Sequence, residues 1–142
     1  MRKRTLARES ALKILYQAEI TRRDIKTSAA NYWSERDDLD GTVKEFCDRL
    51  TSGIQEHVAT IDEKITQYAT NWQIKRMAVI DRNILRLGVF ELLFTPDIPP
   101  KVTINEAVDL AKKYGDLESS KFVNGILDKI HKSEINTGNN PV

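Results

Sequence analysis

The chain of 142 residues has little of what disulfide frameworks and membrane anchors require. It contains one cysteine, Cys47, so no disulfide can form within the chain, and this usage is typical of a reducing compartment. It has no apolar run of the ~18 residues that span a bilayer, and its first ten residues lack the apolar segment of a signal peptide. These absences predict a cytoplasmic protein without a membrane partner.

The sequence also lacks the patterns of a catalytic or metal site. His57 and His131 are isolated, and no pair of histidines has the helical spacing of metal ligands. No glycine-rich phosphate-binding motif precedes a predicted helix, and the carboxylates are scattered over helical faces. We therefore expect no metal, no cofactor and no enzymatic activity.

Excess charge of one sign is nearly absent, because the formal net charge is only +1, but the charge is unevenly placed. The first thirteen residues carry five basic side chains against Glu9 alone, a balance of +4 that leaves −3 for the rest. The five are Arg2, Lys3, Arg4, Arg8 and Lys13. Such a local basic patch can steer a polyanion towards a nearly neutral protein.

The apolar periodicity is helical nearly everywhere, and no segment shows sustained strand-like alternation. It predicts an all-α protein without internal repeats. The boundary between the third and fourth segments stays open at this stage. The expected helical segments are residues 5–20, 31–39, 42–57, 61–72, 79–94, 103–115 and 117–131.

The first segment combines a buried stripe with two candidate contact features. The stripe consists of Ala7, Ala11, Ile14 and Ala18. Tyr16 lies about 160° from it, on the face of Glu9 and Leu12, so we expect all three to point outward. Tyr16 then contacts either another protein or another part of this fold. Arg4 and Arg8 lie one turn apart after Arg2 and Lys3, which suits either phosphate contact or an ordinary solvated terminus.

Residues 79–94 are apolar almost all round and predict a central helix. The prolines of residues 95–100 end that helix. Thr103 and Glu106 have the spacing of a capping box, which predicts the start of the next helix at Thr103. Gly115 is its expected end.

The last segment places one aromatic ring at the edge of its buried face. That face consists of Val123, Ile126, Leu127 and Ile130. Phe122 lies about 90° from its centre, close to Glu118, Gly125 and Lys129. Gly125 leaves room for close approach, and Lys121 and Lys129 supply charge for a stacked nucleotide. The alternative is that Phe122 simply seals the edge of the core.

Four stretches together resemble the NusB family: ARESALKILYQ, IDRNILRLGVFELL, IPPKVTINEAVDLAKKYG and SSKFVNGILDK. The resemblance is dense over residues 79–130, recognisable over 4–20 and looser over 21–78. It implies about seven helices in two small helical subdomains that form one compact RNA-binding domain, residues 1–135. We expect residues 136–142, which are polar up to the final valine, to form a disordered tail.

The resemblance also implies a function, transcription antitermination. NusB-like proteins pair with the ribosomal protein NusE, bind single-stranded boxA RNA, and join the RNA polymerase antitermination complex, notably during ribosomal RNA transcription. It implies RNA contacts at Arg2, Lys3, Arg4, Arg8, Lys121 and Phe122, and an effect of Glu118 on RNA affinity. It implies NusE contacts at Tyr16 and Asp81. Thr5 and Leu6 interrupt the arginine-rich run of the family.

Two alternatives remain beside this function. NusB-like domains are also fused to RNA methyltransferases, but 142 residues leave no room for a cofactor-binding α/β domain, so we do not expect that activity. A structural helical homodimer without specific RNA binding is the other alternative. Because the family includes dimers, the oligomeric state stays open.

Overall fold

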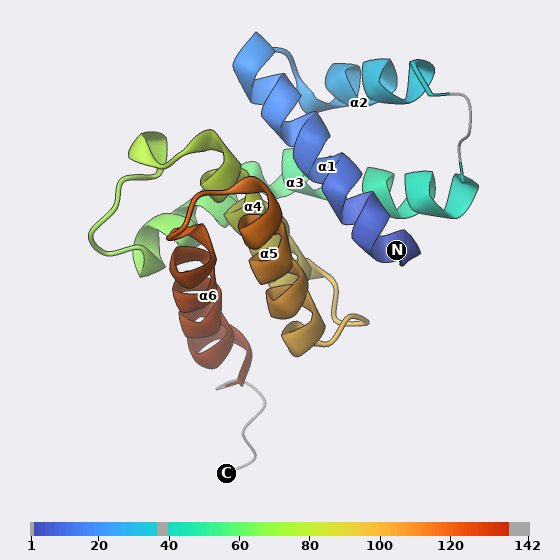
Figure 1. The fold of residues 1–142 in the computed structure, drawn as a ribbon. Helices are drawn as coiled ribbons and strands as arrows, with labels where there is room; N and C mark the ends of the chain where they lie inside the picture. The colour runs from blue at the N-terminus through green and yellow to red at the C-terminus, as the bar shows by residue number, and fades with distance from the viewer. Residues whose placement is uncertain (1, 37–39, 137–142) are drawn as a thin grey trace. The chain divides into compact units, whose positions relative to one another are not determined.

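The computed structural model describes residues 2–36 and 40–136, and every regular element within them is helical (Figure 1). This confirms the predicted all-α fold with about seven helices. None of the described helices is both long and apolar enough to cross a bilayer. The elements are α1 (Lys3–Thr21), α2 (Ile25–Ser34), α3 (Gly41–Tyr68), a 3-10 turn (Ile74–Arg76), α4 (Val79–Phe94), α5 (Pro100–Tyr114), α6 (Ser119–Ile130) and a π-helical turn (His131–Asn136).

The chain forms two compact units, unit 1 up to His57 and unit 2 from Val58 onward. Helix α3 contributes to both, and its backbone leaves helical geometry at His57, where φ is −113° and ψ is 19°. Such a conformation interrupts the helical hydrogen-bond pattern and kinks the helix. The boundary that the periodicity left open after residue 57 therefore lies at His57.

In unit 1, α1 packs against α2, and the predicted stripe of α1 is buried. Tyr16 points outward with 38% of its surface exposed, as predicted. The outward placement of its two neighbours is wrong, because Leu12 is 1% exposed and Glu9 is 8% exposed. Helix α1 is buried over more of its circumference than the predicted stripe. A periodicity analysis that assumes a single buried face does not reveal this.

The second helix occupies residues Ile25–Ser34 and not 31–39 as predicted. Its start is set by Asp24, whose carboxylate accepts a hydrogen bond from the backbone N–H of Thr27 at 2.6 Å. This hydrogen bond lowers the pKa of Asp24. An aspartate in this position satisfies one of the N–H groups that a helix start leaves unpaired. Residues 37–39 of the predicted segment lie outside the described part of the chain.

In unit 2, α4 spans Val79–Phe94 as predicted and packs against both α5 and α6 (Figure 1). Gly88 allows α4 and α6 to approach closely. A Cβ atom built on Gly88 would lie 2.6 Å from Cδ1 of Leu127, a side chain that is fully buried. The central position predicted for this helix is confirmed by its burial on all sides.

Helix α5 begins at Pro100, three residues before the predicted Thr103. Proline suits the first helical position because an N–H group there would have no hydrogen-bond acceptor within the helix. Thr103 is therefore inside the helix, and its hydroxyl donates a hydrogen bond to the buried carboxylate of Glu91 at 2.9 Å. The capping-box prediction is wrong, whereas the end of α5 at Gly115 is confirmed.

Helix α6 begins at Ser119, and its buried face is the predicted one. Its start is fixed by Asp116, whose Oδ1 accepts hydrogen bonds from the backbone N–H groups of Glu118 and Ser119. The helical path continues as a π-helical turn to Asn136. The rest of the predicted tail, residues 137–142, lies outside the described residues.

Candidate nucleic-acid interface

The first candidate surface is the basic edge of α1, formed by Arg2, Lys3, Arg4 and Arg8. The first three are exposed. Arg2 is the residue that precedes the helix, and the first turn contains no acidic side chain. Because the partial positive charge of a helix start disfavours cations, this arrangement is electrostatically costly without an anion nearby. The basic edge is therefore suited to a phosphate group.

Two arginines of the basic edge lie over one aromatic ring. The guanidinium carbons of Arg4 and Arg8 are 4.6 and 5.3 Å from the ring centroid of Phe46 in α3. This confirms that they share one edge of α1. Arg8, however, is only 3% exposed, so it packs within the unit instead of extending the solvated strip expected from the sequence. The cation–π contacts hold both guanidinium groups in place.

A hollow of about 450 Å³ lies beside the basic edge, and it includes a cation that the sequence reasoning missed. Lys3 and Arg4 line it from α1, and Arg49 lines it from α3. Of the described residues that line it, only Glu45 is acidic. Arg49 lies about 45 residues from the basic edge in the sequence, so only the packing of α1 on α3 brings it there.

Asp40 partly neutralises the basic edge. Its carboxylate accepts hydrogen bonds from the hydroxyl and the backbone N–H of Thr42 and lies 3.3 Å from the Lys3 ammonium. The Thr42 hydroxyl, then its N–H group, and to a smaller extent Lys3 lower the pKa of Asp40 to about 2. Asp40 therefore stays ionised near neutral pH and caps the start of α3.

The second candidate surface is a groove in unit 2, which we call the aromatic groove. Its hollow of about 200 Å³ is lined by Trp72, Phe122, Lys121, Lys129 and Gly125, among others. The rings of Trp72 and Phe122 meet edge to face, with centroids 5.5 Å apart and planes at 74°. Phe122 is half-buried, as its predicted position at the edge of the α6 face implies.

Trp72 is a residue that the sequence reasoning placed wrongly. The predicted helical segment 61–72 ended at Trp72, but α3 ends at Tyr68 and Trp72 is 56% exposed. The polar pair Thr70 and Asn71 could have signalled this, because it interrupts the apolar pattern just before the tryptophan.

Glu118 and Lys121 both lie exposed beside Phe122 at the start of α6. The backbone carbonyl of Glu118 accepts a hydrogen bond from the N–H of Phe122 at 3.1 Å, so the two residues are one helical turn apart. A carboxylate in this place repels phosphate, whereas Lys121 attracts it. The structure thus brings the three predicted residues of α6 together.

The two residues expected at a protein partner lie in different units. Tyr16 is exposed on α1, and Asp81 lies in the first turn of α4. Atom Oδ1 of Asp81 is buried, and no side chain or backbone group among the described residues donates a hydrogen bond to it. A buried acceptor without a donor is unfavourable, but this atom is not accessible to another molecule. Asp81 as a whole is half-buried, and the start of α4 favours its negative charge.

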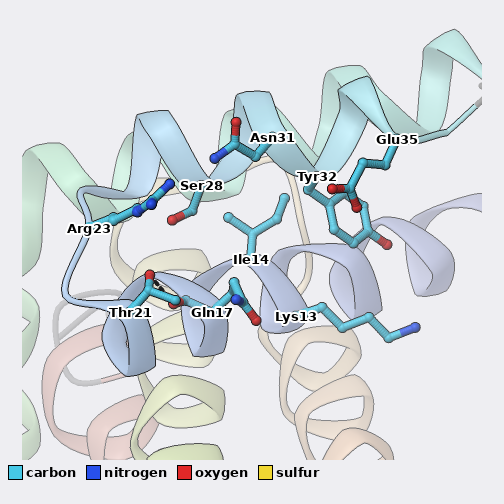
Figure 2. A pocket seen from close by; sticks show the side chains of 9 residues that line it. All are labelled: Lys13, Ile14, Gln17, Thr21, Arg23, Ser28, Asn31, Tyr32 and Glu35. Atoms are coloured by element: carbon cyan, nitrogen blue, oxygen red, sulfur yellow. Dashed lines mark hydrogen bonds between the residues drawn. The ribbon is translucent and has the colours of Figure 1, made fainter.

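A further groove, between α1 and α2, contains none of the predicted site residues (Figure 2). Ile14 points from α1 towards α2, and Thr21 donates a hydrogen bond to the carbonyl of Gln17 at 2.7 Å (Figure 2). The groove has a volume of about 480 Å³ and a mixed charge, with Lys13 and Arg23 against Glu35. This mixture favours no particular ligand.

Comparison with known proteins decides the family. The family model described as "NusB family" matches residues 5–132, which is most of the chain. The chain belongs to the NusB family. This confirms the resemblance seen in the sequence motifs.

Three similar proteins illustrate the match. The transcription antitermination protein NusB of Anaeromyxobacter dehalogenans (strain 2CP-1) is 45% identical over 128 residues, which cover 90% of this chain and 89% of the relative. The solved structure of NusB from T. maritima is 41% identical with a TM-score of 0.84 and covers 94% of this chain and 92% of that one. A NusB solved in complex with NusE and dsRNA is 32% identical with a TM-score of 0.85, covering 94% and 98%.

Proposed function

We propose that this NusB-family chain is a transcription antitermination factor that binds boxA-type single-stranded RNA together with a NusE-type ribosomal protein. The observation that carries the proposal is the similarity to the NusB solved with NusE and dsRNA, which extends over 94% of this chain. The curated relatives carry the name transcription antitermination protein. In this role the complex joins RNA polymerase and supports processive transcription of ribosomal RNA.

In this proposal the basic edge supplies phosphate contacts. Arg2, Lys3 and Arg4 are exposed, the first turn of α1 has no acidic residue, and Asp40 neutralises only part of their charge. Phosphate contacts give affinity that depends on salt and little on sequence. Arg8 is nearly fully buried over Phe46, so its role is to stabilise the structure of the basic edge.

The aromatic groove supplies contacts of another kind. Phe122 presents part of its ring in a hollow that also holds Lys121. Single-stranded RNA is recognised largely through unstacked bases that stack on aromatic rings, with cations close by for the backbone. Glu118, one turn before Phe122, lowers the affinity by repelling phosphate.

Tyr16 and Asp81 are the proposed contacts with the NusE-type protein. Tyrosine is favoured at interfaces because its ring is apolar and its hydroxyl polar. Asp81 is half-buried, and its negative charge suits a basic group of the partner. Asp81→Lys should weaken association with the partner, and calorimetry would measure this; unchanged affinity would remove Asp81 from the interface.

The proposed role needs recognition and not catalysis. We propose that the chain acts in the cytoplasm, where transcription takes place, and that it has no enzymatic activity of its own. Its effect on transcription comes from joining RNA to a protein partner.

Fluorescence anisotropy tests the proposal with a labelled boxA-type RNA and a scrambled RNA of the same composition. Each RNA is titrated with the chain alone and with an equimolar NusE-type protein. The proposal predicts a preference for the boxA-type RNA that increases with the partner. Equal binding of both RNAs in both titrations would contradict it, and a dimer in light scattering would then favour the structural homodimer.

A further inference from the structure

Trp72 is an exposed aromatic residue whose position is only partly explained by contacts within the protein. It lies between the end of α3 and the 3-10 turn Ile74–Arg76, with 56% of its surface exposed. Its ring and that of Phe122 are inclined at 74°, so Phe122 does not stack flat on it. Exposing this much of a large apolar ring costs free energy that burial would recover. Such exposure is typical of a ring that a ligand covers.

The charges around Trp72 suit a nucleic acid. Lys121 and Lys129 of α6 line the aromatic groove, and neither forms an ion pair with the described residues. None of the described residues that line this hollow is a carboxylate, whereas the hollow beside the basic edge includes Glu45 and the α1–α2 groove includes Glu35. The aromatic groove therefore combines uncovered aromatic surface with positive charge, as single-stranded nucleic acid sites do.

The size of the hollow favours a stacked base over an enclosed metabolite. Its volume of about 200 Å³ is below the roughly 300–1,000 Å³ of pockets that enclose a small molecule. Gly125 lines it, and nothing lies within 4 Å of where a Cβ atom would stand. A flat ring can therefore approach α6 without meeting a side chain at this position.

We infer that Trp72 is a base-stacking residue, and that it and Phe122 hold successive bases of the single-stranded RNA while Lys121 and Lys129 contact the backbone. This inference rests on the proposed function, since it names a further residue of the same RNA site. Phe122 orients Trp72 through the edge-to-face contact. Trp72 thereby contributes to RNA affinity without contributing to its salt dependence.

Intrinsic fluorescence tests the stacking directly, because the chain has two tryptophans and the other, Trp33, lies in unit 1. In Trp33→Phe, all tryptophan emission comes from Trp72. Titration with a boxA-type RNA should quench this emission, and the NusE-type protein is added where binding requires it. The double variant Trp33→Phe, Trp72→Phe is titrated in parallel, and its signal, which contains the partner's own emission, is subtracted. Binding without quenching would overturn the inference.

Affinity measurements complete the test. Trp72→Ala should weaken RNA binding by about 5- to 150-fold, the range for loss of one stacked base, with the salt slope unchanged. Trp72→Phe should restore most of the affinity. An abasic RNA should make Trp72→Ala and the wild type bind alike when the missing base is the stacked one. Val102→Ala on α5 removes another exposed apolar side chain and should have no effect.

The outcomes separate the inference from the proposed function. If the wild type does not select the boxA-type RNA, the proposed function fails and the inference fails with it. If the wild type selects the RNA but Trp72→Ala, with an unchanged melting temperature, binds equally well, only the inference fails.

Discussion

The basic edge of α1 and the aromatic groove of unit 2 hold their functional side chains in opposite ways. The basic edge has exposed cations on a helix start that disfavours them, with Lys3 paired to Asp40 and Arg4 placed over Phe46. The aromatic groove has two rings in mutual contact, and among the described residues no carboxylate lines it. One surface is organised around charge and the other around uncovered aromatic area.

This difference predicts different energetics for the two surfaces. Phosphate contacts release counterions, so their contribution falls as salt rises, by about 0.7 in log–log slope for each contact on a single strand. Stacking of bases on rings is nearly independent of salt and contributes about 1–3 kcal/mol per base. Variants of the two surfaces should therefore differ in the salt dependence of their RNA affinity, even where the affinities at one salt concentration are equal.

The largest expected effect on RNA affinity comes from removing the ring of Phe122 from the aromatic groove. Phe122→Ala should weaken RNA binding by about 1–3 kcal/mol, because it removes one stacking surface and the contact that orients Trp72. Anisotropy at a single salt concentration measures this. Phe122→Trp should keep most of the affinity, and a loss equal to that of the alanine variant would show that ring stacking is not the cause.

The second prediction concerns the helix packing that supports the groove. Gly88→Ala should destabilise the protein by about 1–2 kcal/mol, because a Cβ there meets the buried Leu127 and the cost of overpacking exceeds the gain in helix propensity. Gly125→Ala is the matched control on α6. It meets nothing within 4 Å and should stabilise the protein by about 0.5–1 kcal/mol. Urea unfolding curves would show opposite signs, and equal shifts would contradict this account of the two glycines.

Arg4→Ala should have a moderate effect of a different type. One lost phosphate contact should lower the salt slope by about 0.7 and the affinity by about three- to fivefold near physiological salt. Arg23→Ala removes another exposed arginine of unit 1 and serves as the control. If both variants changed the slope equally, the effect would come from net charge and not from the basic edge.

Glu118→Gln should strengthen RNA binding by about two- to threefold, because it removes a repulsive charge beside Phe122 while keeping the shape of the side chain. The matched control is Asp109→Asn on α5, which removes the same charge from another exposed position of unit 2. Weaker binding of Glu118→Gln, measured in the same anisotropy assay, would refute the repulsion.

The smallest effect concerns pH and the support of the basic edge. Asp40 has a pKa of about 2 in the folded protein against 3.8 in its ordinary state, so its contribution to stability is complete above about pH 4 and is lost as pH falls towards 2. The wild type should therefore melt above Asp40→Ala near neutral pH, with a difference that narrows between pH 3.8 and 2. A constant difference over this range would contradict the assigned role of the carboxylate.

The sequence predicted those features that depend on local patterns. The limits of α4 follow from its apolar run and the proline stop, and the buried face of α6 follows from its period. The start of α2 was missed because a single capping residue, Asp24, outweighs the apolar pattern. Thr103 was misread because its hydroxyl bonds to Glu91 of another helix instead of capping its own.

The candidate site was predictable in its residue types but not in its tertiary details. The motifs indicated Arg4 and Phe122, but the burial of Arg8 depends on Phe46, which is distant in the sequence. The exposure of Trp72 depends on where α3 ends. Tertiary packing decides both, and no periodicity within one helix contains that information.

The salt dependence of RNA binding, measured together for three proteins, tests the division between the two surfaces most directly. The proteins are the wild type, Phe122→Ala, and the triple variant Arg2→Ala, Lys3→Ala, Arg4→Ala, each titrated with boxA-type RNA over a series of salt concentrations. We predict that the triple variant has a slope lower by about 2, and that Phe122→Ala binds more weakly with the slope of the wild type. Equal slopes for all three proteins, or a reduced slope for Phe122→Ala alone, would contradict the account.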